Sequence, residues 1–276
     1  MPTRARMRQR TIGAFRASFE SFGFAPLDTP ALETQEVLLA DTGVDANKQT
    51  YRFNDLDNEP VGLRYDFTVS LARAVAMNQN QLQFPFKRYQ FGPVWRFDKP
   101  KRGRFREFMQ MDIDIVGAQP YEPEVELVAA TAEGFRRLGI SGYYFRVNDR
   151  RWLGAELARL GVPLEKEKDV FRVLDKLQKQ GEGKVRAELT GKLLLQDFDS
   201  ALEFQRMQEI AISDEAAGGL LALLKQPDAL SQYLAPFLAR VRDEGVPDDC
   251  IVADPSLTRG LDYYTRTVFE IQPPGE

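Results

Sequence analysis

Two neighbouring stretches between Phe86 and Gly117 alternate apolar and polar side chains, and this pattern constrains the fold most. A period of two is that of a β-strand, so we expect two facing strands, each with one face in the core. In the first strand the expected core face holds Tyr89, Phe91, Pro93, Trp95 and Phe97, and the opposite face holds Arg88, Gln90, Arg96 and Asp98. In the second strand Met109, Met111, Ile113 and Ile115 alternate with Gln110, Asp112 and Asp114.

The segment between these strands is strongly basic. From Lys87 to Arg106 there are eight basic residues and one acid, Asp98. A cationic loop at one end of a strand that carries carboxylates places opposite charges near one site, as a zwitterion together with a triphosphate would require. The alternative interpretation is a hairpin with a solvated polar face and an exposed basic tip.

The rest of the chain alternates helical and strand patterns, which predicts an α+β fold with an antiparallel sheet flanked by helices. Helical spacing covers residues 4–22, 69–78 and a segment that begins at Pro123, whereas strand patterns cover 49–53, 61–65, 143–147, 251–253 and 263–271. Residues 164–246 lose the strand pattern, and their 12 basic against 15 acidic residues favour a solvated helical subdomain over a nucleic-acid clamp. We therefore expect a core of residues 1–163 and 247–276 and a helical insertion at 164–246.

Two scarcities limit the chemistry. The chain has no histidine and one cysteine, Cys250, which excludes a histidine general base, a Ser-His-Asp triad, an internal disulfide and a thiolate metal cluster. We expect no resident metal, and any catalysis must use Arg, Lys, Tyr, carboxylates and backbone. The attack of an amino-acid carboxylate on the α-phosphorus of ATP suits this set, because it depends on positioning and charge neutralisation.

Composition also bounds the location and the partners. The net charge of −4 argues weakly against a general nucleic-acid coat, although local patches can still bind phosphate. No apolar run approaches the roughly 18 residues of a membrane span. The single cysteine suits a reducing compartment. We expect a soluble, cytoplasmic protein without membrane contact.

A second informative stretch runs from Thr258 to Glu270. By itself it reads as a turn that leads into a β-branched and aromatic strand. Its sequence RGLDYYTRTVFE, however, resembles the histidine-binding motif of histidyl-tRNA synthetases, and FKRYQFGPVWRFDKPKRGRFREFMQMDIDIVG resembles motif 2 of that class II family. LRYDFTVSLARAVAMN is similar to the amino-acid-binding segment, and FGFAPLDTPALETQEVLL is similar to motif 1, which lies at the dimer interface in the family. The resemblance covers almost the whole chain and implies a class II synthetase-like fold.

The resemblance implies a set of site residues, a set of substrates and a homodimer. The residues that match the family's histidine contacts are Asp66, Thr68, Gln110, Asp114, Tyr263 and Tyr264. The catalytic arginines match Arg96 and Arg259. The residues that match its ATP contacts are Arg96, Asp98 and Arg104. Asp114 and Tyr264 would read the imidazole, whose two nitrogens a carboxylate and a phenol can pair. The implied substrates are L-histidine, ATP with Mg²⁺, and tRNA(His).

Other interpretations remain open at this stage. The sequence stops before the glycine-rich motif 3 and the anticodon-binding domain of the family, so we expect a fragment that alone forms histidyl-adenylate slowly. A second interpretation is a noncatalytic synthetase-like protein, such as the histidine-sensing regulatory subunit of ATP phosphoribosyltransferase, whose short length this chain shares. A third is a pseudo-synthetase interaction module. Arg96, Arg104 and Arg259 together favour the enzyme, because a sensor needs no α-phosphate clamp.

Overall fold

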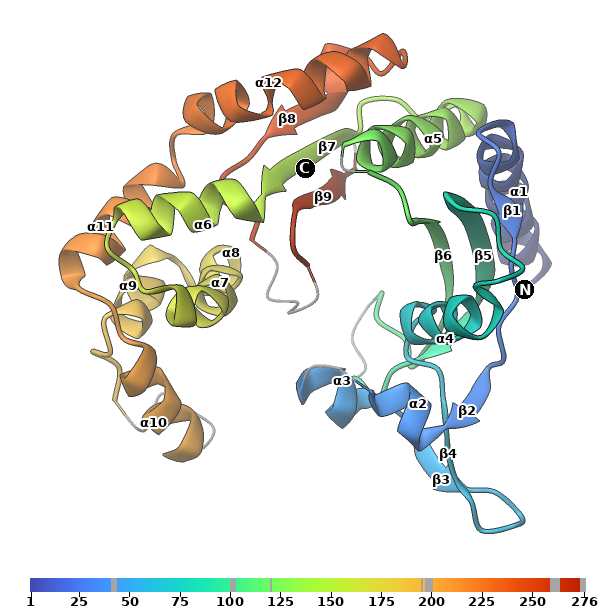
Figure 1. The fold of residues 1–276 in the computed structure, drawn as a ribbon, viewed down its shortest axis with the longest axis horizontal. Helices are drawn as coiled ribbons and strands as arrows, with labels where there is room; N and C mark the ends of the chain where they lie inside the picture. The colour runs from blue at the N-terminus through green and yellow to red at the C-terminus, as the bar shows by residue number, and fades with distance from the viewer. Residues whose placement is uncertain are drawn as a thin grey trace. The chain divides into compact units, whose positions relative to one another are not determined.

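The computed structural model describes residues 1–40, 44–99, 103–119, 121–194, 196, 201–258 and 264–273. Contacts between these residues divide the chain into two compact units, Met1–Ile140 and Ser141–Glu276. Each unit combines helices with a small sheet, as Figure 1 shows. The α+β composition expected from the sequence is confirmed.

The first unit is built on the predicted pair of facing strands. Strand β5 (Phe86–Trp95) pairs antiparallel with β6 (Glu107–Val116), in a register that sets Phe86 opposite Val116 and Trp95 opposite Glu107. The short strand β1 (Ala25–Pro26) joins the other edge of β5 in parallel, which gives the order β1-β5-β6.

Two helices cover one face of this sheet. Helix α1 (Pro2–Ser21) and helix α5 (Glu122–Leu138) lie against each other, α1 also against β5 and α5 against β6 (Figure 1). Their shared core cluster contains Phe15, Phe19, Phe24, Tyr89 and Ala130. The helices predicted at 4–22 and from Pro123 are therefore confirmed, and both pack apolar side chains into this cluster.

A second small sheet completes the first unit. Strands β2 (Leu32–Thr34), β4 (Pro60–Leu63) and β3 (Arg52–Asn54) pair antiparallel in the order β2-β4-β3. Three helices accompany it: α2 (Gln35–Leu39), α3 (Val44–Gln49) and α4 (Thr68–Asn78). The predicted helix at 69–78 is confirmed, and the strands predicted at 49–53 and 61–65 exist with shifted boundaries.

The second unit contains a three-stranded sheet in the order β8-β7-β9. Strand β7 (Tyr144–Asp149) pairs in parallel with β8 (Ile251–Ala253) and antiparallel with β9 (Thr267–Gln272). The strand predicted at 263–271 thus begins later than expected, while Tyr263 lies outside the described residues.

Helices make up the rest of the second unit. They are α6 (Arg150–Arg159), η1 (Leu164–Lys166), α7 (Glu167–Leu174), α8 (Leu177–Gln180), α9 (Glu182–Leu189), α10 (Ala201–Ile210), α11 (Asp214–Leu223), α12 (Pro227–Asp243) and η3 (Asp248–Cys250). The helical character of 164–246 is confirmed for its described residues, whereas its status as a separate insertion stays a prediction. Within the described ranges, no helix combines the length and apolarity needed to cross a bilayer.

Candidate functional site

The polar face of the β5–β6 hairpin is buried along β5 and half-buried along β6, so the interpretation of it as a solvated face is wrong for β5. On β5, Arg88 and Val94 have no exposed surface and Gln90 is 2% exposed, so this face is at least as buried as the aromatic one. The register places Arg88 opposite Asp114 and Gln90 opposite Asp112. Cross-strand neighbours in such pairs lie close enough to interact, so one buried surface carries both the cations and the carboxylates.

The chain segments before and after β4 cover this face. The Arg64 guanidinium donates from Nε to the Pro93 carbonyl at 2.9 Å and from Nη1 to the Thr29 carbonyl at 2.7 Å. It also stacks on the Phe67 ring, 4.7 Å from the centroid. Burial lowers the pKa of Arg64 from its ordinary value, partly offset by the nearby Asp28. Gly92 makes this packing possible, because a Cβ there would lie 2.7 Å from Nη2 of Arg64.

A row of hydrogen bonds runs along the strand ends. Arg96 donates from Nη2 to Oε1 of Gln110 at 3.2 Å and from Nε to the Tyr65 carbonyl at 3.2 Å. Gln110 in turn donates from Nε2 to Oδ2 of Asp112 at 3.1 Å. The Arg96 guanidinium lies over the rings of Tyr65 and Phe108, at 4.2 and 5.1 Å from their centroids. Arg96 is therefore held in place with donors still available to a ligand.

The other end of this surface carries an ion pair. Nη2 of Arg88 lies 2.7 Å from Oδ2 of Asp114, whose side chain is 33% exposed. The same Oδ2 is buried, and the two groups do not have hydrogen-bond alignment. Asp114 can therefore offer Oδ1 to a ligand while the cation stays behind it.

The carboxylates of this surface have raised pKa values. Burial, and next the negative charge of Asp114, raise the pKa of Asp112 to about 6. The hydrogen bond from Gln110 and the positive charge of Arg88 lower this pKa and so oppose part of the rise. Burial also raises the pKa of Asp114, and Arg88 opposes that rise. Asp66 acts on both carboxyl groups as a further negative charge. Perturbed carboxyl groups gathered in one place are typical of binding and catalytic sites.

The predicted residues around α4 and the basic loop also belong to the first unit. Oδ1 of Asp66 accepts from the backbone N–H of Thr68 at 2.9 Å, at the start of α4. Nε of Arg104 lies 3.6 Å from Oδ2 of Asp98, and the Arg104 side chain is 60% exposed. Both ends of the basic loop are described, although its residues 100–102 are not. The first unit thus contains seven predicted site residues: Asp66, Thr68, Arg96, Asp98, Arg104, Gln110 and Asp114.

The remaining predicted residues come from the second unit. Tyr264 is half-buried in the segment that leads to β9. Arg259 and Tyr263 lie outside the described residues. Their predicted roles stay predictions.

Sequence reasoning gave no specific ligand contact to Arg88, Asp112 or Arg64, although it counted Asp112 among the carboxylates near the basic loop. A signal for the first two was present, because antiparallel pairing of two alternating strands sets one polar side chain opposite another. The exact partners needed the register, which the sequence pattern alone left open.

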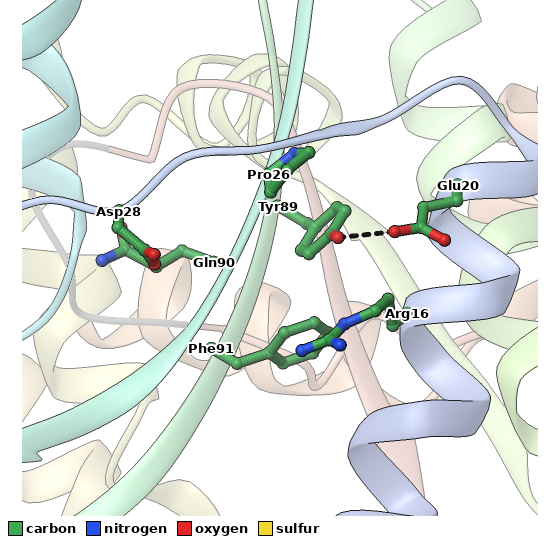
Figure 2. A pocket seen from close by; sticks show the side chains of 7 residues that line it. All are labelled: Arg16, Glu20, Pro26, Asp28, Tyr89, Gln90 and Phe91. Carbon is green, nitrogen blue, oxygen red and sulfur yellow. Dashed lines mark hydrogen bonds between the residues drawn. The ribbon is translucent and has the colours of Figure 1, made fainter.

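A separate hollow of about 360 Å³ lies beside α1 and β5. Figure 2 shows its lining, in which the Tyr89 hydroxyl donates to Oε1 of Glu20 at 2.7 Å, and the Arg16 guanidinium lies 5.9 Å from the Phe91 centroid. Pro26, Asp28 and Gln90 complete it. No predicted site residue lines this hollow. Across the described ranges, no group of three His, Cys, Asp or Glu side chains is arranged to hold a metal ion.

Known proteins share this fold. The crystal structure of histidyl-tRNA synthetase from Nostoc matches 98% of this chain and 62% of its own, with a TM-score of 0.76 and 29% identity. A structure from Bacillus halodurans, described as an ATP phosphoribosyltransferase regulatory subunit/histidyl-tRNA synthetase, matches with a TM-score of 0.74 at 17% identity, over 100% of this chain and 71% of its own. The fold is thus the class II synthetase-like α+β fold.

Sequence comparison gives the family. The histidyl-tRNA synthetase family model matches residues 1–276. Histidine–tRNA ligases from Treponema denticola and Aeropyrum pernix are each 37% identical, over 97% and 96% of this chain and over 59% and 60% of their own lengths. The chain belongs to the histidyl-tRNA synthetase family and spans about three fifths of the length of these relatives.

Proposed function

We propose that this chain binds L-histidine and ATP and forms histidyl-adenylate, which the protein then transfers to tRNA(His) in the cytoplasm. The observation that carries this proposal is the largely enclosed polar face of β5 and β6, where contacts link Arg96 to Gln110, Gln110 to Asp112, and Arg88 to Asp114. Family membership supports the same reaction.

The proposed reaction forms one bond and breaks another. A carboxylate oxygen of histidine attacks the α-phosphorus of ATP, the bond from that phosphorus to the bridging oxygen breaks, and pyrophosphate leaves with Mg²⁺. Arg96 and Arg259 stabilise the charge that develops on the α-phosphate, while Asp98 contacts the adenine and Arg104 the other phosphates. Fixed donors of this kind act most strongly where water is excluded.

The histidine contacts divide between the two ends of the amino acid. Asp66, Thr68 and Gln110 hold the α-amino and carboxylate groups, and Asp114 with Tyr263 and Tyr264 pairs the imidazole nitrogens. A ligand without ring N–H groups would leave these polar groups unpaired in the closed complex, which costs enough to reject it.

The second candidate function is a histidine sensor without catalysis. The likeness to the Bacillus halodurans structure, at 17% identity, supports the shared fold alone. The orientation of Arg96 by Gln110 and Tyr65 favours the enzyme, because a sensor has no use for a cation fixed beside the amino-acid site.

Histidine-dependent exchange of labelled pyrophosphate into ATP separates the two functions. We expect slow exchange with histidine and none with other amino acids, and faster exchange from a version extended to the length of these relatives. Calorimetric binding of histidine without any exchange in either version would establish the sensor, and absence of both binding and exchange would overturn both functions.

We further propose a homodimer formed through residues 22–39, which resemble motif 1 of the family. Light scattering coupled to size-exclusion chromatography tests it, since a mass equal to one 31.4 kDa chain would contradict the dimer.

A further inference from the structure

Arg88 has an unusual environment for a buried cation. Its side chain has no exposed surface, and Nη2 reaches Oδ2 of Asp114 at 2.7 Å. In the part of the chain that the structure describes, neither Nε nor Nη1 has a hydrogen-bond partner. Burying a charge is costly unless the charge is paired and hydrogen-bonded. A contribution to stability therefore does not explain why a guanidinium with unused donors is buried here.

The charges around Arg88 are unequal. Three carboxyl groups act together at this place, Asp66, Asp112 and Asp114, and Arg88 is the cation paired with one of them. The groups that face Asp112 are Gln110 and Asp114 on β6, Arg88 on β5, and Asp66 before α4. Asp114 has the guanidinium directly against it, whereas Asp112 has the Gln110 amide at 3.1 Å.

These contacts assign different states to the two aspartates. Two carboxylates close together do not both ionise easily, and the one nearer to a cation keeps its charge. Asp114 is therefore the anion of the pair. Asp112 is the group that holds a proton below about pH 6 when no ligand is bound, in line with its raised pKa of about 6.

We propose that Arg88 is a positioning residue for amino-acid specificity: it fixes Asp114 as the anion that accepts a ring N–H, and it leaves Asp112 to exchange a proton as the ligand binds. This inference rests on the proposed histidine site. The ligand's α-ammonium group would lie near Asp66 and Gln110, beside Asp112. A positive group there favours the ionised Asp112, so binding below about pH 6 should release a proton.

Arg88→Met and Arg88→Lys test the positioning role. Calorimetry should show that Arg88→Met weakens histidine binding by about 10- to 100-fold, the cost of losing a hydrogen bond to a charged group. In pyrophosphate exchange its KM for histidine should rise much more than its KM for ATP, and its pH profile should move to higher pH because Asp114 loses its cation. Arg88→Lys should recover part of both effects. The matched control is Arg159→Met, a 68% exposed arginine, which should behave as the parent.

Asp112→Asn tests the proton and remains informative if Arg88→Met fails to fold. Histidine binding is measured at pH 5.5 in two buffers that differ in ionisation enthalpy, which gives the protons released. Free histidine titrates in this range too, but equally for both proteins, so the difference between parent and variant belongs to Asp112. We expect the parent to release more protons than the variant.

The outcomes separate the two proposals. If the parent binds histidine and Asp112→Asn releases as many protons as the parent, the role of Asp112 is wrong. An Arg88→Met variant that keeps the parent's histidine KM and pH profile would overturn the role of Arg88 while the proposed function stands. If the parent binds no histidine, the proposed function fails and this inference fails with it.

Discussion

Arg88 in the first unit and Arg146 in the second are both buried, but their surroundings are opposite. Arg146 on β7 is 6% exposed, and each nitrogen of its guanidinium has a partner: Nε donates to Asp254 at 2.6 Å, Nη1 to Glu270 at 3.3 Å and Nη2 to Ser256 at 3.2 Å. Gln178 adds two more contacts, at 2.7 and 3.0 Å, when its amide oxygen faces the guanidinium. Arg88 is buried more completely and has one ion pair.

This difference distinguishes a cation that stabilises the fold from a cation that serves a ligand site. Arg146 links β7 to β9 and to the turn after β8, so its ion pairs hold the sheet and the turn together. Among the described residues, the ion pair of Arg88 joins only β5 and β6, which their backbone pairing already holds together. A protein keeps a poorly satisfied buried charge where a ligand completes the site, and the two arginines should therefore respond differently to substitution.

Arg146→Met should give the largest loss of stability. It leaves Asp254 and Glu270 without their shared cation, and breaking such a buried network costs about 3–5 kcal/mol. The measurement is thermal or urea unfolding, with the exposed Arg159→Met as control. Arg88→Met should lose less, because the Asp114 carboxyl group can take a proton when its partner is removed. Equal losses for Arg146→Met and Arg88→Met would remove the contrast between the two arginines.

The Arg96→Ala variant should catalyse pyrophosphate exchange more slowly but keep the parent's fold and its affinity for histidine. One fixed donor to a developing charge is worth roughly 10²–10³ in rate. We expect that loss in pyrophosphate exchange, with a histidine dissociation constant within about threefold of the parent, less than 1 kcal/mol. Arg137→Ala, a partly exposed arginine paired with Glu133, is the matched control. Exchange at the parent rate would place the phosphate clamp elsewhere.

Asp112→Asn should stabilise the protein at high pH. The folded-state pKa of about 6 lies above the ordinary value of 3.8, so the folded protein binds this proton more tightly than the unfolded chain. The cost of ionising Asp112 is absent below pH 3.8 and complete above about pH 6. Removing it should add of the order of 2–3 kcal/mol at pH 8 and nothing at pH 3.5. Unfolding of both proteins at the two pH values checks this, and a gain that is equal at both would contradict it.

The sequence predicted which residues share a strand face at the site better than it predicted how buried that face is. Alternation placed Gln110, Asp112 and Asp114 on one strand face, and the structure confirms it. The same alternation left the burial of that face open, because a period of two shows that the faces differ and not which one a second layer covers. That layer comes from Thr29 and Arg64, which are distant in sequence and bind the face through carbonyl and amide contacts.

The specific roles depended on family resemblance and not on local pattern. Asp66 and Thr68 look like an ordinary start of a helix, and the bond between them is a common helix-start contact. Arg88 escaped notice because it fits equally well as one of eight basic residues in a cationic stretch. What distinguishes Arg88 from the other basic residues is its burial. The alternation of apolar and polar residues does not show whether a particular lysine or arginine is buried.

Gly92 allows the smallest test of this packed face. A methyl group at this position would approach Nη2 of Arg64 to 2.7 Å and the Phe67 ring to 3.3 Å. The Arg64 guanidinium is held by two carbonyl oxygens, so it can move aside only by breaking those bonds. Gly92→Ala should therefore lose about 1–3 kcal/mol, the usual cost of overpacking.

Gly13→Ala supplies the matched control in the same unit. It lies within α1, and a Cβ at this position meets nothing within 4 Å. Alanine favours a helix over glycine by up to about 1 kcal/mol, so this variant should be as stable as the parent or more stable. Urea unfolding of both variants gives the comparison. If Gly92→Ala is as stable as the parent, the Arg64 layer adapts readily, and the buried face would be too soft to hold Asp114 and Arg88 in a fixed arrangement.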